Sequence, residues 1–215
     1  MAPEDQSSPE LKIPPFARVD ETDDRLFYSY PRKVVHIDDN AIVAVGALYA
    51  ELLPQGSVLL DLMSSWRSHL PPGLQPARVV GLGLNAEEMA ENPQLDDAIV
   101  HDINRNSGLP FGDEVFDAAM CAVSVQYLIN PIHVFREVNR VLRPRSPFIV
   151  TFSNRCFPTK AVALWRATND QQHIAIVTAY FQASGGWRDL KARDCTPGRL
   201  ATGSDPLYAV WARKT

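Results

Sequence analysis

The chain has 215 residues, of which 46% are hydrophobic and 21% are charged, and its formal net charge is −4. This composition is ordinary for a soluble globular protein, and the slight negative charge disfavours nucleic acid as a partner. No apolar run is long enough to span a membrane, and the polar, acidic start differs from a secretory signal, so we expect a cytoplasmic protein. The cysteines lack metal-ligand spacing, which predicts free thiols and no metal site: Cys121, Cys156 and Cys195.

The amino-terminal part of the chain is expected to form a tail followed by a lid. The first dozen or so residues combine prolines with polar side chains and predict a loose tail. A helix is then expected with Asp39 or Asn40 as its N-terminal cap, and Pro54 ends it. We expect residues 1–55 to form the tail and the lid or helix segment, and residues 56–215 to form the core domain. The stretch ahead of the helix gathers four side chains suited to ligand binding: Tyr28, Tyr30, Arg32 and His36.

Apolar runs alternate with helical patterns through the rest of the chain. Five near-continuous apolar runs predict strands that are buried on both faces: residues 57–62, 78–84, 98–103, 116–125 and 147–153. Helical patterns are found at the capping-box signal of Asn85 and Glu88, at residues 131–142 and at residues 171–184. Residues 187–194 and 205–214 predict an antiparallel pair of strands. The alternation predicts an α/β protein with a mainly parallel, doubly wound sheet.

A ligand site is expected where the parallel strands end, because doubly wound sheets bind ligands at the carboxyl ends of their strands. That rule selects residues 61–65, 81–85, 102–104 and 124–127. Asp61 and Asp102 each follow an apolar strand and can accept hydrogen bonds from an amine. Each aspartate can alternatively cap a turn, and the sequence leaves both interpretations open.

The stretch "LPFGDEVFDAAMCAVSVQYLINPIHVFREVNRVLRP", residues 109–144, resembles the class I S-adenosylmethionine-dependent methyltransferases and most closely their small-molecule branch. By the order of its elements the resemblance covers residues 57–215. It implies a Rossmann-like α/β fold with a mainly parallel seven-stranded sheet, an antiparallel last strand and helices on both faces. It also implies S-adenosyl-L-methionine as the cofactor and methyl transfer to a small-molecule acceptor that the sequence does not specify.

The cofactor loop departs from the family pattern. The family's "DLGCGTG" is replaced by the glycine-free "DLMSSWR", and Gly83 stands where family members carry an acid that binds both ribose hydroxyls. Arg145 and Ser146 replace the family's "GG" ahead of the fifth strand. Two other hypotheses stay open: a catalytically inactive binding or interaction protein that has lost the cofactor, and a nicotinamide dehydrogenase, whose fingerprint "GLGLNA" resembles only loosely.

The resemblance implies a set of cofactor-binding residues at the strand ends. Asp61 is expected to bind the ammonium of the cofactor, and Ser64 and Ser65 its carboxylate, aided by a helix that starts near Ser65. Asn85 is expected to reach a ribose hydroxyl, and Asp102 the exocyclic amine of adenine. The complete expected set is Asp61, Met63, Ser64, Ser65, Gly81, Leu82, Gly83, Leu84, Asn85, Asp102, Ile103, Ser124 and Val125.

Methyl transfer from a sulfonium depends mainly on positioning, so the reaction requires no fixed catalytic group. A general base helps when the acceptor carries a proton, and His36, Tyr30 and Tyr127 are the candidates. The residues expected to bind the substrate are Tyr28, Arg32, Asn154 and Arg155. The sequence does not indicate an oligomeric state.

Overall fold

The structure is a computed structural model that describes residues 14–198 and 203–215, so the predicted loose tail lies almost entirely outside the described residues. The strands are β1 (Val58–Leu62), β2 (Arg78–Gly83), β3 (Asp97–Val100), β4 (Ala118–Ala122), β5 (Pro147–Phe152), β6 (Trp187–Asp194) and β7 (Tyr208–Lys214). The helices are α1 (Asp24–Phe27), α2 (Asp39–Leu52), α3 (Ala86–Ala90), α4 (Pro131–Val141), α5 (Ala163–Arg166) and α6 (Asp170–Ser184), with a 3₁₀ turn η1 (Val125–Tyr127).

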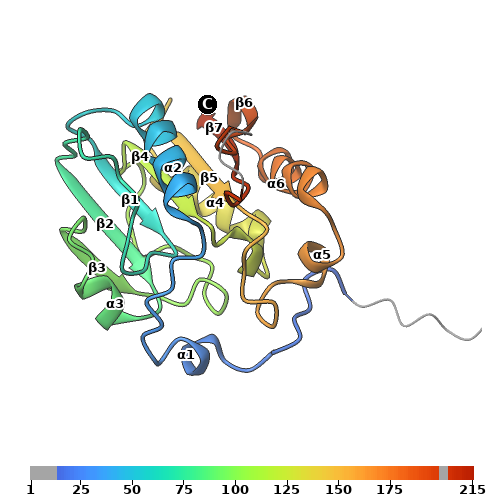
Figure 1. Cartoon of the computed structure of the whole chain (residues 1–215). Helices are drawn as coiled ribbons and strands as arrows, with labels where there is room; N and C mark the ends of the chain where they lie inside the picture. Colours follow the sequence, from blue (N-terminus) through green and yellow to red (C-terminus); the bar gives the residue numbers. More distant parts are fainter. Residues whose placement is uncertain (1–13, 199–202) are drawn as a thin grey trace, which may run out of the picture.

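All seven strands form one sheet in the order β3-β2-β1-β4-β5-β7-β6 (Figure 1). The pairs between β1 and β2, β2 and β3, β1 and β4, and β4 and β5 are parallel. Strand β7 is antiparallel to both β5 and β6. The predicted Rossmann-like α/β fold, with a seven-stranded sheet and an antiparallel last strand, is therefore confirmed.

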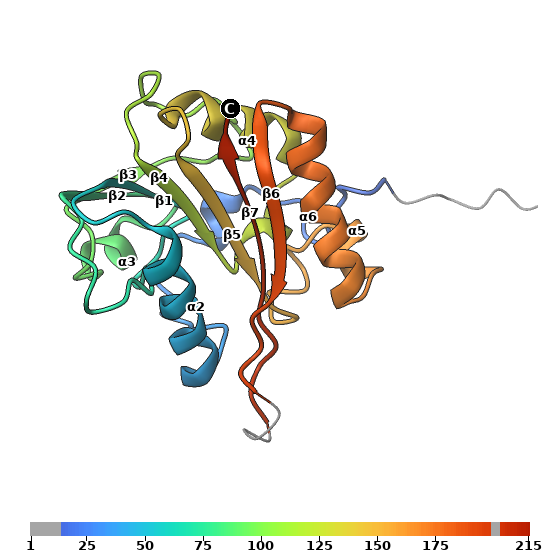
Figure 2. The same ribbon diagram turned by 90° about the horizontal axis from the view of Figure 1, so that it is seen from above.

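The two faces of the sheet are covered by different helices (Figure 2). On one face, α4 and α6 pack onto β4 and β5 through residues such as Phe135 and Phe181. On the other face, α2 packs through Val45 and Tyr49. The cap of α2 is Asp38, whose side chain accepts from the backbone N–H of Ala41, and not Asp39 or Asn40 as predicted. The extended backbone at Asp38 explains the difference, because a cap residue lies just outside the helix.

Two predicted strands end earlier than their apolar runs. Strand β3 stops at Val100, so Asp102 lies in the following loop and not in the strand. Strand β4 stops at Ala122, because Val123 adopts a left-handed φ of 50° that a strand does not tolerate. After both strands, the chain therefore turns near the carboxyl edge of the sheet.

The connection between β1 and β2 differs from the prediction. Residues 63–77, all of which the structure describes, contain no helix, so the helix expected near Ser65 is wrong. Met63 instead takes a left-handed φ of 60°, and the backbone N–H of Ser64 donates to the carbonyl of Leu82 at 2.8 Å. The chain leaving β1 is thereby held against the end of β2.

The segment of residues 14–38 runs across the carboxyl edge of the sheet from beside α5 to the start of α2 (Figure 1). Its first part is fixed by backbone hydrogen bonds from Ala163 N to Ala17 O at 2.7 Å and from Asp20 N to Thr159 O at 2.9 Å. Its second part is fixed by Asn85, whose side-chain amide donates to Tyr28 O at 2.8 Å. The segment therefore covers the place where a ligand of this sheet is expected.

Candidate functional site

One cleft lies between the carboxyl edge of the sheet and residues 14–38, which we call the covering segment. The ends of β1 and β2, the loops after β3 and β4, and the chain after β5 form its floor and one wall. Residues 24–37 also line the cleft, and His36 among them contacts Phe157 of the chain after β5. The cleft therefore joins the predicted cofactor positions to the predicted substrate positions.

Asp61 lies at the base of the cleft and is almost fully buried. Its Oδ2 atom accepts hydrogen bonds from Ser64 Oγ at 2.6 Å and from Ser68 Oγ at 2.7 Å. Burial raises the pKa of Asp61 to about 6, although the bonds from Ser64 and Ser68 lower it. Its Oδ1 atom accepts no hydrogen bond from the part of the chain that the structure describes, so this oxygen is left for a cationic or amine ligand.

The hydroxyl of Ser65 is also bound to a carboxylate. It donates to Glu88 Oε2 at 2.5 Å, while the backbone N–H of Arg32 donates to Glu88 Oε1 at 2.7 Å. The side chain of Glu88 therefore does not complete the predicted capping box, although Asn85 does cap α3. Glu88 instead ties the cofactor loop and the covering segment to the start of α3.

Gly83 leaves no room for a side chain. A Cβ atom there would lie 2.2 Å from the carbonyl oxygen of Ser64 and 3.0 Å from Met89 Sδ. The backbone of the loop after β1 thus occupies the space into which an acidic side chain at the end of β2 would project. The loop lacks glycine and the end of β2 lacks the acid, and both features belong to one packing arrangement of the loop against β2.

Asn85 and Asp102 are both engaged in local hydrogen bonds. Asn85 Oδ1 accepts from Glu88 N at 2.9 Å, and its amide group donates to Tyr28 O at 2.8 Å, so the side chain is held at the start of α3. Asp102 Oδ1 accepts from the backbone N–H of Asn104 and of Arg105, both at 3.1 Å. Asp102 thus shapes the turn after β3, and its Oδ2 atom accepts no hydrogen bond from the described residues.

Rings form the wall of the cleft that lies away from β3. Phe157 is the centre, with ring centroids 4.5 Å from His36, 5.4 Å from Phe27 and 6.3 Å from Tyr127. Burial lowers the pKa of His36, against an opposing effect of Glu88. Burial raises the pKa of Tyr127, whose hydroxyl accepts from the backbone N–H of Phe157 at 2.8 Å. His36 is therefore neutral near pH 7, and Tyr127 is engaged in a structural bond.

Most predicted site residues meet in this cleft, but several do not. Gly81, Val125, Tyr30, Asn154 and Arg155 do not line it. The side chain of Tyr30 is 78% exposed, and Arg155 pairs with Asp205 at 2.7 Å outside the cleft. All the other predicted cofactor residues, together with Tyr28, Arg32, His36 and Tyr127, line the cleft.

The cleft also contains residues that sequence reasoning missed. His69 has a left-handed φ of 58°, and burial lowers its pKa to about 4, with a further contribution from Arg67. Asn104 lies within residues 102–104, which the strand-end rule selected, but it was not included in the expected cofactor set. No local pattern marks His69 or Phe157, because neither belongs to a strand end or a regular helix.

The comparisons with known proteins agree with this geometry. Residues 66–150 match a family model described as a methyltransferase domain. The fold is similar to a methyltransferase from Mesorhizobium loti, at 16% identity over 78% of this chain and 96% of that chain, with a TM-score of 0.54. The family model thus matches part of the chain, and the solved structures show that the chain has the fold of S-adenosylmethionine-dependent methyltransferases.

Two further structures share the methyltransferase fold at low identity. A chain from the complex formed by the Trm112 methyltransferase activator of Haloferax volcanii is 14% identical over 82% of this chain and 90% of that chain, with a TM-score of 0.62. Geranyl diphosphate C-methyltransferase from Streptomyces coelicolor, solved with S-adenosyl-L-homocysteine, is 16% identical over 80% of this chain and 76% of that chain, with a TM-score of 0.51. A search of the curated proteins found no match.

The residues of the cleft fit S-adenosyl-L-methionine, the cofactor of the methyltransferases that share this fold. Asp61 offers the free Oδ1 atom to the ammonium, and the backbone N–H groups of Ser65 and Trp66 donate to no acceptor within the described residues, which leaves them for a carboxylate. Leu84 and Ile103 supply apolar contacts on the β2 and β3 side. Glu88 is the carboxylate that lies beyond Gly83 on the same side. No described helix is long and apolar enough to cross a membrane.

Proposed function

We propose that this methyltransferase transfers a methyl group to a small-molecule acceptor that binds against the ring wall of the cleft. The observation that carries the proposal is the continuity of one cleft from Asp61 and Gly83 to His36 and Phe157. A cofactor held at the strand ends and an acceptor held at the rings would share this space. Positioning two reactants in one cleft supplies a large part of the rate of a displacement reaction.

The chain's own groups would bind and orient the cofactor. S-adenosyl-L-methionine supplies an electrophilic methyl group on a sulfonium. Asp61 would accept from its ammonium, and the backbone of Ser65 and Trp66 would bind its carboxylate. Glu88 would accept a hydrogen bond from a ribose hydroxyl in place of the missing acid at Gly83. Asp102 would accept a hydrogen bond from the exocyclic amine of adenine.

His36 would act as the general base for an acceptor that loses a proton. Its neutral imidazole lies in the cleft and makes no hydrogen bond to the described residues, so it has a free acceptor nitrogen. Tyr127 is a poorer base, because burial raises its pKa and its oxygen already accepts from Phe157. Tyr30 points to solvent and would play no part.

Calorimetric titration with S-adenosyl-L-methionine and S-adenosyl-L-homocysteine tests the proposal. We expect saturable binding of both ligands, and an Asp61→Asn change should weaken it about tenfold or more, because one charge-assisted hydrogen bond is lost. An exchange of Asp189 for Asn, on the remote edge strand β6, is the matched control and should leave binding unchanged. Absence of heat and of a thermal shift with either ligand at millimolar concentration would contradict the proposal.

A second candidate is a binding or interaction protein that uses this fold without the cofactor. The hydroxyl protons of Ser64 and Ser65 are already donated to Asp61 and Glu88, and the amide of Asn85 is donated to Tyr28, which favours this candidate. Wild-type binding by both Asp61→Asn and Asp61→Ala would also favour it, since Asp61 would then only hold its turn.

A further inference from the structure

The ring wall of the cleft carries a guanidinium group. The Cζ atom of Arg32 lies 4.0 Å from the ring centroid of Phe27 and 5.6 Å from that of Phe157. An arginine stacked on rings in this way is held in place by cation–π attraction and by its contact area. Arg32 is exposed, and its guanidinium lies on the ring of Phe27 at the edge of the cleft.

Arg32 uses little of its hydrogen-bonding capacity. Its Nη2 atom donates to Phe27 O at 2.9 Å, and within residues 14–198 and 203–215 its side chain makes no other hydrogen bond and no ion pair. A guanidinium has five N–H donors in a planar fork that matches a carboxylate. The remaining donors are therefore available to an anion in the cleft.

None of the four acidic side chains that line the cleft pairs with the guanidinium of Arg32. Asp24 pairs with Arg18 at 2.7 Å and with Lys160 at 3.1 Å, and Glu88 accepts from Ser65 and from a backbone N–H. Asp61 accepts from two serines at the cofactor end. The other arginine of the cleft, Arg67, lies over Trp66 on the cofactor loop, 4.4 Å from the ring centroid.

A positively charged acceptor is disfavoured at this wall. Arg32 already occupies the face of Phe27 that would attract a cation, and it would repel a second positive charge. A flat acceptor can instead lie against Phe157 and Tyr28 while its anionic group meets the guanidinium. His36 stands at the same ring, 4.5 Å from the centroid of Phe157.

We propose that the acceptor site selects planar aromatic molecules that carry a carboxylate, with Arg32 binding the carboxylate and Phe157 binding the ring. The proposal rests on the proposed function, because it names the class of acceptor that the methyltransferase cleft would take. Arg32 and Phe157 are the specificity-determining residues.

The test is equilibrium binding of matched compounds to the whole chain, measured by calorimetry with and without saturating S-adenosyl-L-homocysteine. The first set is 4-hydroxybenzoate, its neutral amide 4-hydroxybenzamide and the cationic 4-hydroxybenzylamine, and the second set carries the same three groups on naphthalene. We expect each carboxylate to bind at least about tenfold more tightly than its amide and amine partners.

Substitutions test the roles of Arg32 and Phe157 separately. Arg32→Gln should remove the preference for carboxylate over amide, whereas Lys33→Gln, which removes the neighbouring charge outside the cleft, should retain it. Phe157→Leu keeps an apolar side chain of similar size, and it should reduce the preference for benzoate over cyclohexanecarboxylate while carboxylates still bind.

The inference is overturned if neither carboxylate binds at millimolar concentration, if the amides or amines bind as tightly, or if the preference survives in Arg32→Gln. These outcomes are distinct from failure of the proposed function. Binding of S-adenosyl-L-homocysteine without any carboxylate preference would remove only the acceptor class. A carboxylate preference without cofactor binding would keep the acceptor site and remove the methyltransferase activity.

Discussion

At the scale of single residues, the carboxyl edge of the sheet shows how a cofactor loop can be built without glycine. Met63 takes the left-handed backbone conformation that glycine adopts most easily, with a φ of 60°. The following carbonyl, that of Ser64, then lies against Gly83. In this chain the glycine that permits the close approach is therefore on the neighbouring strand β2 and not in the loop.

This exchange predicts that Gly83 is intolerant of any side chain. A Gly83→Ala change would place Cβ 2.2 Å from a backbone oxygen, so the loop or the strand must shift. We expect the free energy of unfolding to fall by about 2 kcal/mol or more, as in overpacked cores. Chemical denaturation measures this loss.

The control is Gly73→Ala in the same connection, where a Cβ would meet no atom within 4 Å. It should change the stability by less than about 0.5 kcal/mol. Equal effects of the two changes would refute the close packing of Gly83. Gly83→Asp, which writes the family's acid back into the sequence, should destabilise the chain and not improve cofactor binding.

The raised pKa of Asp61 predicts that the free energy of unfolding depends on pH. Its pKa is about 6 in the folded chain and about 3.9 when exposed, so the folded state binds more protons between these values. The stability that protonation of Asp61 supplies is complete below about pH 4 and is lost as the pH rises through about 6. The difference corresponds to about 3 kcal/mol.

Denaturation curves of the parent and of Asp61→Asn between about pH 4 and pH 7 test this linkage. The parent should lose up to about 3 kcal/mol relative to the variant across that range. Asparagine keeps the shape and an oxygen acceptor for Ser64 and Ser68 but does not titrate. Parallel curves for the two proteins would show that Asp61 ionises normally.

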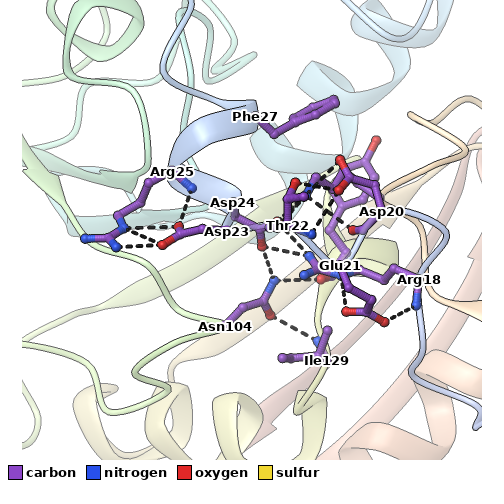
Figure 3. Close-up of polar contacts among 12 residues, drawn as sticks. Arg18, Asp20, Glu21, Thr22, Asp23, Asp24, Arg25, Phe27, Asn104 and Ile129 are labelled. Atoms are coloured by element: carbon purple, nitrogen blue, oxygen red, sulfur yellow. Dashed lines mark hydrogen bonds and ion pairs between the residues drawn. The ribbon is translucent and has the colours of Figure 1, made fainter.

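At the scale of elements, the covering segment is attached to the core through one buried network (Figure 3). Asp24 accepts from Arg18 at 2.7 and 2.8 Å and from Asn104 at 2.9 Å, and it pairs with Lys160, which is fully buried. Burial by itself would raise the pKa of Asp24, but the bonds from Asn104, Arg18 and Lys160 outweigh it and the pKa is lowered. The network is therefore intact above about pH 4 and weakens in acid.

Removing the charge of Asp24 should loosen the segment and leave the sheet in place. Asp24→Asn removes the carboxylate that Arg18 and the buried Lys160 share, and leaves Lys160 paired with Asp20 alone, at 3.2 Å. Breaking a buried pair costs up to about 3–5 kcal/mol. Hydrogen exchange should accelerate at Ala163, whose N–H donates to Ala17 O, but not at the amides between β4 and β5.

Arg25→Gln is the control for this experiment, because Arg25 forms an exposed pair with Asp23 on the same segment. Such pairs contribute less than about 1 kcal/mol, so exchange at Ala163 should stay at the parent rate. Uniform acceleration throughout the sheet in Asp24→Asn would show that the network stabilises the whole fold and not the segment.

At the scale of the whole molecule, the sequence was sufficient to predict the sheet but not every residue that lines the cleft. Apolar runs such as residues 147–153 predicted their strands because burial on both faces leaves a continuous local signal. Residues at strand ends, such as Asp61 and Ser124, were predicted by the same rule of topology. Glu88 and Phe157 were not assigned to the site, since their roles come from partners far away in sequence that no local pattern encodes.

The attachment of the covering segment has a consequence for the order in which the chain folds. Residues 14–38 are synthesised before their partners in the core: Asp24 bonds with Asn104, 80 residues on, and Thr22 with Lys160, 138 residues on. Contacts of such long sequence separation form slowly, because a large loop must close before they are gained. We expect the sheet to assemble before residues 14–38 attach to it, so that the cleft is the last part of the molecule to form.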